Sequence, residues 1–339
     1  MSSRAPLAFL ALALLAGCAD APPRPAAPPE PARTLAGGVG RLDVRFPCGD
    51  TECAAWLFLP PAPSPPPVVV MAHGFAGTRD VALARFAERF AREGLAALVF
   101  DYRHFGASGG SPRQLVDPWR QLEDWRAALA FARAEPRVDG SRLAVWGSSL
   151  GAGHALVTAA EDGGTRAVVA QAPLIDTGME GEATFYGVGW VVRLLLTAWA
   201  DLAAGALGRE PVTIPAIAPA GGFGMILDDR AYQAFERLVE PGSSYRNAVA
   251  ARSILTFDSY DPAPQALTIE APVLLLASRA DRFAPYAAVE ALAAGGPRVT
   301  VETLEGDHFD VYSPPIADHA ADRAARFLAE HLEAGRAAR

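Results

Sequence analysis

The residues in this chain best suited to carry out chemistry lie around a serine between two glycines. Positions 147 to 151 read Gly-Ser-Ser-Leu-Gly, and Ser149 has a glycine two positions away on each side. An apolar run, residues 143 to 146, precedes this pattern, and a stretch of small residues, 152 to 160, follows it. A sharp turn between a buried strand and a helix would expose the serine hydroxyl, and glycines would let strand and helix approach closely. The pattern predicts Ser149 as a nucleophile and Ser148 as a packing residue.

A serine nucleophile needs a base to take its proton and an acid to orient that base. Asp281 follows the apolar run 272 to 277, which is suited to a buried parallel strand. His308 follows residues 298 to 304, which alternate like a strand. The carboxyl ends of parallel strands meet at one crevice, so we expect these side chains to lie together. Where the serine lies on such a turn between a strand and a helix, the triad is expected in the chain order serine, acid, histidine.

Other residues compete for the two supporting roles. Asp281 could be a loop residue or a helix cap, and Asp258 or Asp261 could be the acid instead. Those two lie in a Tyr- and Pro-rich segment and not directly after an apolar strand, which favours Asp281. His104 precedes the nucleophile in the chain, the wrong order for such a triad. The remaining histidines considered as the base lie in predicted helices: His154, His319 and His331.

Acyl transfer also requires two donors for the negative oxygen that develops on the carbonyl. A predicted buried strand, residues 68 to 72, runs into His73-Gly74-Phe75. We expect the backbone amides of Phe75 and Leu150 to be these donors. Gly74 would let the backbone approach a ligand, and His73 is interpreted as structural.

These segments together resemble the α/β hydrolase superfamily. The resemblance spans about residues 40 to 335, with the matching pieces in the expected order: 73 to 75, 101 to 108, the turn around Ser149, the strand to Asp281, and 306 to 309. Residues 105 to 114 and 308 to 312 resemble a subgroup of bacterial hydrolases related to fungal polyketide transferases. The resemblance implies an eight-stranded, mostly parallel sheet flanked by helices, with hydrolysis or acyl transfer at Ser149.

Hydrophobic periodicity independently predicts an α/β fold. Strand patterns alternate with helical patterns, which indicates a parallel sheet with right-handed crossovers. The predicted strands are 68 to 72, 95 to 100, 142 to 146, 166 to 172, 272 to 277 and 298 to 304. The predicted helices are 79 to 93, 117 to 134, 149 to 160, 285 to 294 and 316 to 334. Residues 41 to 46 and 53 to 59 are expected to form an antiparallel hairpin at the sheet edge.

One segment, about residues 177 to 264, interrupts this alternation and is predicted to be a helical cap inserted over the site. It contains an apolar aromatic stretch, residues 185 to 199, in which Arg193 argues against a membrane span. This stretch could line an acyl pocket or pack against the core, since clefts and cores use the same residues.

Composition excludes several classes of function. All 30 basic residues are arginine, so neither a Schiff-base lysine nor a phosphate-binding P-loop lysine is possible, and no cofactor is expected. A formal charge of −8 and the lack of a basic run argue against nucleic acid as a partner. No protein partner is evident. The continuous alternation favours one α/β domain with a cap over residues 38 to 335.

The N-terminus is predicted to direct export. Arg4 precedes an apolar run, and Leu-Ala-Gly-Cys at positions 15 to 18 resembles a bacterial lipoprotein processing site. Residues 1 to 17 would be removed, and Cys18 would be acylated and held at a membrane of the cell envelope. The alternative is an ordinary secretory signal with a coincidental cysteine. Removal of Arg4 would change the charge from −8 to −9, and residues 18 to 37, rich in Pro and Ala, would form a tether.

Two further cysteines, Cys48 and Cys53, flank a four-residue turn in the predicted edge hairpin. Export would permit a disulfide between them, and two reduced thiols are the alternative. No second pair of ligands accompanies them, so the spacing is not a zinc signature and no metal is expected.

These observations predict a membrane-tethered serine hydrolase. It would cleave a small-molecule carboxylic ester or thioester through an acyl-enzyme on Ser149, with His308 and Asp281 completing the triad. Acyl transfer to an alcohol or amine, of the polyketide transferase type, is the nearest alternative, and peptidase activity is another. A lipoprotein that only binds an apolar ligand is the non-enzymatic alternative.

Overall fold

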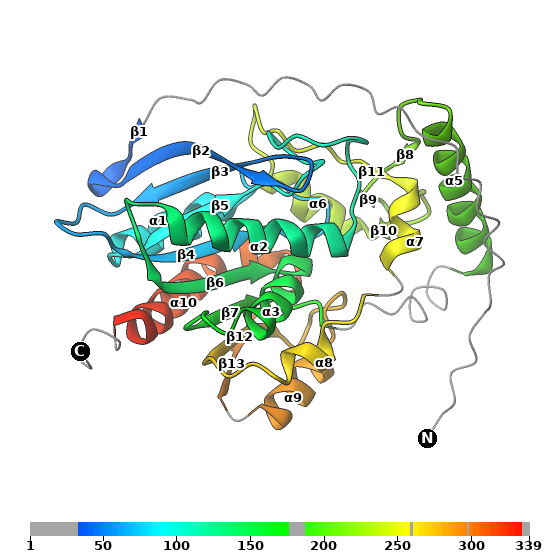
Figure 1. The fold of residues 1–339 in the computed structure, drawn as a ribbon. Helices are drawn as coiled ribbons and strands as arrows, with labels where there is room; N and C mark the ends of the chain where they lie inside the picture. The colour runs from blue at the N-terminus through cyan, green and yellow to red at the C-terminus, as the bar shows by residue number, and fades with distance from the viewer. Residues whose placement is uncertain (1–32, 176–186, 258–259, 297, 334–339) are drawn as a thin grey trace.

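The computed structural model describes residues 33–175, 187–257, 260–296 and 298–333 (Figure 1). Several predictions fall outside this range: the signal peptide 1 to 17, Cys18, most of the tether, the alternative acid Asp258, and positions 185 and 186 of the apolar stretch.

A nine-stranded sheet forms the centre of the described chain, in the order β1-β2-β3-β5-β4-β6-β7-β12-β13. Its strands are β1 (Arg33–Thr34), β2 (Gly40–Cys48), β3 (Thr51–Leu59), β4 (Pro67–Ala72), β5 (Ala96–Phe100), β6 (Asp139–Ser148), β7 (Val168–Gln171), β12 (Val273–Ser278) and β13 (Val299–Leu304). Within this sheet β5, β4, β6, β7, β12 and β13 pair in parallel, while β2 and β3 form an antiparallel hairpin towards the edge. The predicted mostly parallel sheet with this hairpin is confirmed. The ninth strand, β1, was not predicted, because two residues paired with β2 carry no periodic signal.

Helices cover both faces of the sheet, so its central strands are apolar on both sides. Helices α1 (Leu83–Arg92) and α10 (Ile316–Glu333) share a core with Val69 and Met71 of β4. Helices α2 (Pro118–Ala134), α3 (Leu150–Asp162) and α9 (Tyr286–Gly295) cover the opposite face, where Val68 and Val70 point.

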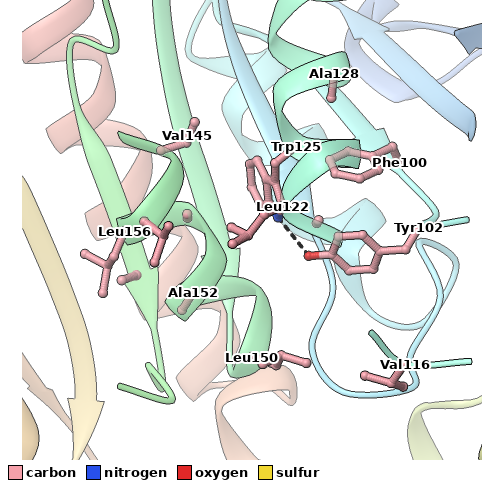
Figure 2. Close-up of a cluster of buried hydrophobic side chains, with 14 of the residues drawn as sticks. Phe100, Tyr102, Val116, Leu122, Trp125, Ala128, Val145, Leu150, Ala152 and Leu156 are labelled. Atoms are coloured by element: carbon pink, nitrogen blue, oxygen red, sulfur yellow. Dashed lines mark hydrogen bonds between the residues drawn. The ribbon is translucent and has the colours of Figure 1, made fainter. Parts of the chain in front are cut away.

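The core behind the turn at Ser149 is aromatic and carries a buried hydrogen bond. The Trp125 indole of α2 donates to the Tyr102 hydroxyl at 2.9 Å, among Phe100, Leu150 and other buried side chains (Figure 2). Both polar atoms are therefore satisfied inside the core, which fixes the orientation of the two rings.

The segment between β7 and β12 holds the predicted cap. Its described elements are α5 (Val188–Ala206), β8 (Thr213–Ile214), β9 (Ile217–Ala218), β10 (Ile226–Leu227), α6 (Asp229–Leu238), β11 (Val249–Ala250), the 3-10 helix η2 (Ala251–Ser253), α7 (Ile254–Phe257) and α8 (Ala263–Ala266). Two further 3-10 turns lie outside it, η1 (Ala36–Gly38) and η3 (Asp310–Tyr312). The cap is mixed and not wholly helical: β9 pairs with β10, and β8 with β11. Prolines at 211, 215 and 219 interrupt helical hydrogen bonding there, which favours short extended segments.

The Cys48 and Cys53 sulfurs lie 2.09 Å apart across the turn between β2 and β3, as in a disulfide. Both residues are fully buried. The Asp124 carboxylate is close to both sulfurs, but it accepts hydrogen bonds from the Arg103 guanidinium at 2.7 Å and backbone N–H at 2.9 Å. Bridged sulfurs offer no thiolate, so this cluster is not a metal site.

Candidate active site

The turn at Ser149 holds its backbone in a strained conformation. Ser149 joins the last residue of β6 to the first residue of α3, with φ 56° and ψ −122°. Such angles are costly for a residue with a Cβ, and this kind of strain is concentrated at functional sites. A side chain at Gly147 would overlap the Gly151 carbonyl, so the close approach of strand and helix requires glycine there.

The three side chains predicted to act together form one hydrogen-bonded chain. His308 Nε2 lies 2.9 Å from Ser149 Oγ, and His308 Nδ1 lies 2.7 Å from Asp281 Oδ2. With the proton on Nδ1, the imidazole donates to Asp281 and accepts from the serine hydroxyl. All three residues are buried, and Ser149 retains 9% exposure. The arrangement can transfer the serine proton to His308 as the oxygen attacks a carbonyl.

Backbone amides fix the orientation of the Asp281 carboxylate. Its Oδ1 accepts hydrogen bonds from the N–H groups of Phe283 and Ala284, both at 2.8 Å. The carboxylate therefore combines a helix-cap-like role with its contact to His308 through the other oxygen. Asp261 instead accepts from the Ala263 N–H at the start of α8.

The other histidines of the described chain have different surroundings. His104 is buried, and burial, reinforced by nearby arginines, lowers its pKa to about 3. His319 lies on α10 and bonds to Glu302, and His331 packs its ring against Phe327. His73 contacts the Tyr102 ring edge-on, and burial lowers its pKa.

His154, one turn beyond the nucleophile, is a fully buried member of a hydrogen-bonded network. Its Nε2 lies 2.9 Å from Gln121 Oε1 and its Nδ1 lies 2.6 Å from the Tyr260 hydroxyl. The neutral imidazole satisfies both bonds by donating to Gln121 and accepting from Tyr260. Burial lowers the pKa of His154 to about 3, because the charged form would lose its hydration.

This depressed pKa predicts acid sensitivity. In the unfolded chain His154 binds a proton near pH 6.5, whereas in the folded chain it stays neutral down to about pH 3. The contribution of His154 to the free energy of unfolding is therefore fully present well above pH 6.5 and is lost as the pH falls toward 3. We expect His154→Gln to reduce the loss of unfolding free energy between pH 7 and pH 5 by about 2 kcal/mol, measured by urea unfolding. Tyr260→Phe, which removes one hydrogen bond but keeps the imidazole, should lower stability at both pH values equally. An unchanged pH dependence in His154→Gln would contradict the assignment.

The two residues expected to supply the oxyanion donors both lie close to the nucleophile. Leu150 is the first residue of α3, so its N–H has no partner within the helix. Phe75 lies in a turn closed by a hydrogen bond from Gly77 N–H to the Gly74 carbonyl. A Cβ at Gly74 would lie 2.8 Å from Ser149 Cβ, so this turn passes directly beside the serine.

An apolar cavity opens beside Ser149 and His308, with an empty volume of about 520 Å³, part of it continuous with solvent. Residues from the loop after β4, from the start of α1 and from the cap line it: Phe75, Val81, Leu83, Ile217, Ile226, Phe235 and Leu238. No described residue of α5 lines this cavity. An apolar chamber at a nucleophile suits a hydrocarbon or aryl portion of a substrate.

Polar contacts join the cap to the core at two places. Asp80 accepts hydrogen bonds from the hydroxyls of Thr78, Ser243 and Ser244 and from the Ser244 N–H, at 2.5 to 3.0 Å. Burial would raise the pKa of Asp80, but these hydrogen bonds outweigh it and lower the pKa. At the second place, the Arg282 guanidinium lies 2.5 Å from the carboxylate of Asp228 at the start of α6.

Several cavity residues had not been identified from the sequence. Tyr312 follows His308 on η3, lines the cavity, and places its hydroxyl 2.6 Å from Ser148 Oγ. Ser148 is fully buried, as expected of a packing residue. Phe235 and Leu238 lie three residues apart on α6, a spacing that puts them on one helix face and was the signal available in the sequence.

A protein-family model matches the central part of this chain. A family model described as serine aminopeptidase, S33, matches residues 63–307, from just before β4 to the residue before His308. The match therefore covers the turn at Ser149, the segment between β7 and β12, and Asp281.

Similar proteins include the quorum-quenching protein AidA of Acinetobacter baumannii, 40% identical over 80% of this chain and 88% of its own length. A thiohydrolase of Eupenicillium brefeldianum is 30% identical over 88% of this chain and 96% of its own. The crystal structure of the α/β hydrolase GrgF from Penicillium sp. sh18 superposes with a TM-score of 0.74 and 26% identity, over 86% of this chain and 99% of that one; a Penicillium protein grgF is named a polyketide transferase. The predicted α/β hydrolase fold is confirmed.

Proposed function

We propose, for a chain that belongs to the serine aminopeptidase S33 family of α/β hydrolases, that Ser149 attacks the carbonyl carbon of an ester or thioester. The hydrogen-bonded chain from Ser149 through His308 to Asp281 carries this proposal, because it ends at an apolar cavity. That arrangement supplies a nucleophile, a proton acceptor and a place for the substrate.

In the proposed reaction His308 Nε2 takes the hydroxyl proton while Ser149 Oγ bonds to the carbonyl carbon. The negative oxygen of the tetrahedral intermediate is stabilised by the N–H groups of Phe75 and Leu150. Asp281 stabilises the imidazolium that forms. His308 then gives its proton to the leaving alcohol or thiol, and water, activated by the same imidazole, releases the acid from Ser149.

The cavity favours a substrate with an apolar acyl portion. Its described lining has no acidic side chain, whereas a peptidase that binds a free amino terminus needs a negative group to pair with the ammonium. The similar thiohydrolase supports a thioester as one form of the substrate. These observations favour ester or thioester hydrolysis over peptide hydrolysis.

Acyl transfer is the second candidate, because a similar protein is named a polyketide transferase. The two reactions share the acyl-enzyme and differ in the group that attacks it. An alcohol or amine acceptor in place of water would give a new ester or amide instead of the free acid.

Covalent labelling tests the assignment of the nucleophile. A fluorophosphonate probe should react with the wild-type chain, and peptide mapping should place the adduct on Ser149. Ser141→Ala, an exposed serine on β6, should label normally, while Ser149→Ala should not. An adduct on another residue would overturn the proposal. Esters and thioesters of graded acyl length, with and without added alcohols and amines, would then separate hydrolysis from transfer.

We also propose that the chain is an exported lipoprotein held by acylated Cys18. The apolar run ending in Leu-Ala-Gly-Cys supports this. The bridged pair Cys48 and Cys53 is compatible with it, because disulfides persist in oxidising compartments outside the cytosol.

A further inference from the structure

The outward side of α5 carries an unusual set of exposed apolar side chains. Of the eight large apolar side chains that are strongly exposed in the described residues, five lie on α5 or at its C-terminal cap: Val188, Val192, Leu196, Trp199 and Leu207. At 3.6 residues per turn these positions fall within roughly 100° of the helix circumference, so they form one stripe. We call this stripe the outer face of α5.

The opposite side of α5 fixes the helix to the domain. Trp190, Leu194, Ala198 and Asp201 are buried. The Trp190 indole donates to the Gly224 carbonyl at 3.0 Å, and the Asp201 carboxylate pairs with the Arg252 guanidinium through bonds of 2.7 and 2.8 Å. Removing one partner of a buried ion pair is strongly destabilising.

This attachment decides between two ways in which α5 could meet a membrane. Among the described helices, α5 alone has the length and apolar composition to cross a bilayer. Crossing would withdraw Asp201 from Arg252 and carry the carboxylate into hydrocarbon, at a high cost. Lying along the bilayer surface leaves both sides of α5 satisfied, one by the domain and the other by lipid.

We infer that the outer face of α5 inserts into the interface of the bilayer to which the chain is tethered, and this inference rests on the proposed anchor at Cys18. Fifteen residue steps separate Cys18 from Arg33, where the described domain begins. A Pro-rich chain of that length reaches about 45 Å, comparable with the diameter of a domain of this size. The tether therefore keeps α5 within reach of the same bilayer at a high effective concentration.

The charges in and around α5 indicate that apolar insertion dominates this contact. The whole chain has a formal charge of −8, so anionic lipid would not attract the domain overall. Of the two charged residues in α5, Asp201 is paired internally, and Arg193 stacks on the Phe223 ring at 3.9 Å. Trp199 has the amphipathic ring that is enriched at membrane interfaces. Binding should thus resist salt.

Vesicle flotation of the mature chain, residues 18 to 339, carrying Cys18→Ala and therefore unable to be acylated, tests the inference. We expect this chain to bind phosphatidylcholine vesicles at low and high salt alike. Adding Leu196→Asp and Trp199→Asp should lower the partition coefficient about tenfold or more, because two charges replace inserted apolar groups. Leu267→Asp, an exposed leucine outside α5, is the matched control and should bind normally. Lipids brominated in the acyl chain should quench Trp199 fluorescence, and Trp199→Phe should remove that component.

Three outcomes would overturn the inference. The Cys18→Ala chain fails to bind vesicles, the control variant loses as much binding as the α5 variant, or the Cys18→Ala chain forms a dimer without lipid that the α5 variant abolishes. The last would mean that a second copy covers the outer face. Turnover of a soluble short ester should be unchanged in every α5 variant, which shows that the variants fold. Membrane fractionation of wild-type and Cys18→Ala chains in cells reports on the anchor separately, and probe labelling reports on Ser149 separately.

Discussion

Ser149→Ala should lower kcat/KM for ester or thioester hydrolysis by about four to six orders of magnitude, because no other hydroxyl is held at His308 Nε2 in the described site. His308→Ala should fall to a similar residual rate. The serine hydroxyl at 2.9 Å from the imidazole is a weak nucleophile unless that nitrogen removes its proton. The cavity and the amides of Phe75 and Leu150 stay in place in both variants, so some rate above the uncatalysed reaction should persist.

The double variant Ser149→Ala/His308→Ala provides a sharper measurement than either single change. Residues that act as one unit are not additive, so its rate should match that of the single variants. Ser141→Ala and His319→Ala are the controls and should retain wild-type rates, because both residues are exposed and neither contacts the triad. Independent losses that multiply in the double variant, or full activity in Ser149→Ala, would contradict a shared mechanism. Binding of an apolar ligand without turnover by the wild-type chain would favour the non-enzymatic alternative.

The α/β architecture could be predicted from the sequence because its central strands have a clear hydrophobic pattern. Residues 68 to 72 and 273 to 277 are continuous apolar runs between turn signals, and both faces of those strands are covered by helices. The two-residue strand β1 and the four short strands of the cap were missed, since two residues have no period. Their pairing is set by partners elsewhere in the chain.

The residues that the structure brings together at Ser149 could also be chosen from sequence, because each follows a strand that ends at the same edge of the sheet. The cavity wall could not. The sequence predicted that the apolar stretch at 185 to 199 would line a pocket or pack against the core. The described part of this stretch has a buried side, with Trp190 and Leu194, and an exposed side, with Leu196. The wall comes instead from α6 and the short cap strands, whose few apolar residues acquire their role only when the cap folds over the core.

Asp281→Asn should lower kcat by about three to four orders of magnitude while leaving KM and stability nearly unchanged. The reason lies in the two backbone N–H groups that hold Oδ1. An asparagine must turn its carbonyl oxygen toward Phe283 and Ala284 to keep those bonds, which points its NH2 group at His308 Nδ1. The imidazole then accepts at Nδ1 and carries its proton on Nε2. A protonated Nε2 cannot take the proton of Ser149.

This tautomer argument separates a role in orienting the base from a role in holding the loop. Asp281→Ala loses both the charge and the bonds to Phe283 and Ala284, so it should lose stability as well as kcat, whereas Asp281→Asn should unfold at nearly the wild-type denaturant concentration. Asp258→Asn and Asp261→Asn replace the acids that the sequence left as alternatives, and both should retain wild-type kcat. A loss of kcat in either of them equal to that of Asp281→Asn would mean that another carboxylate orients His308 during turnover.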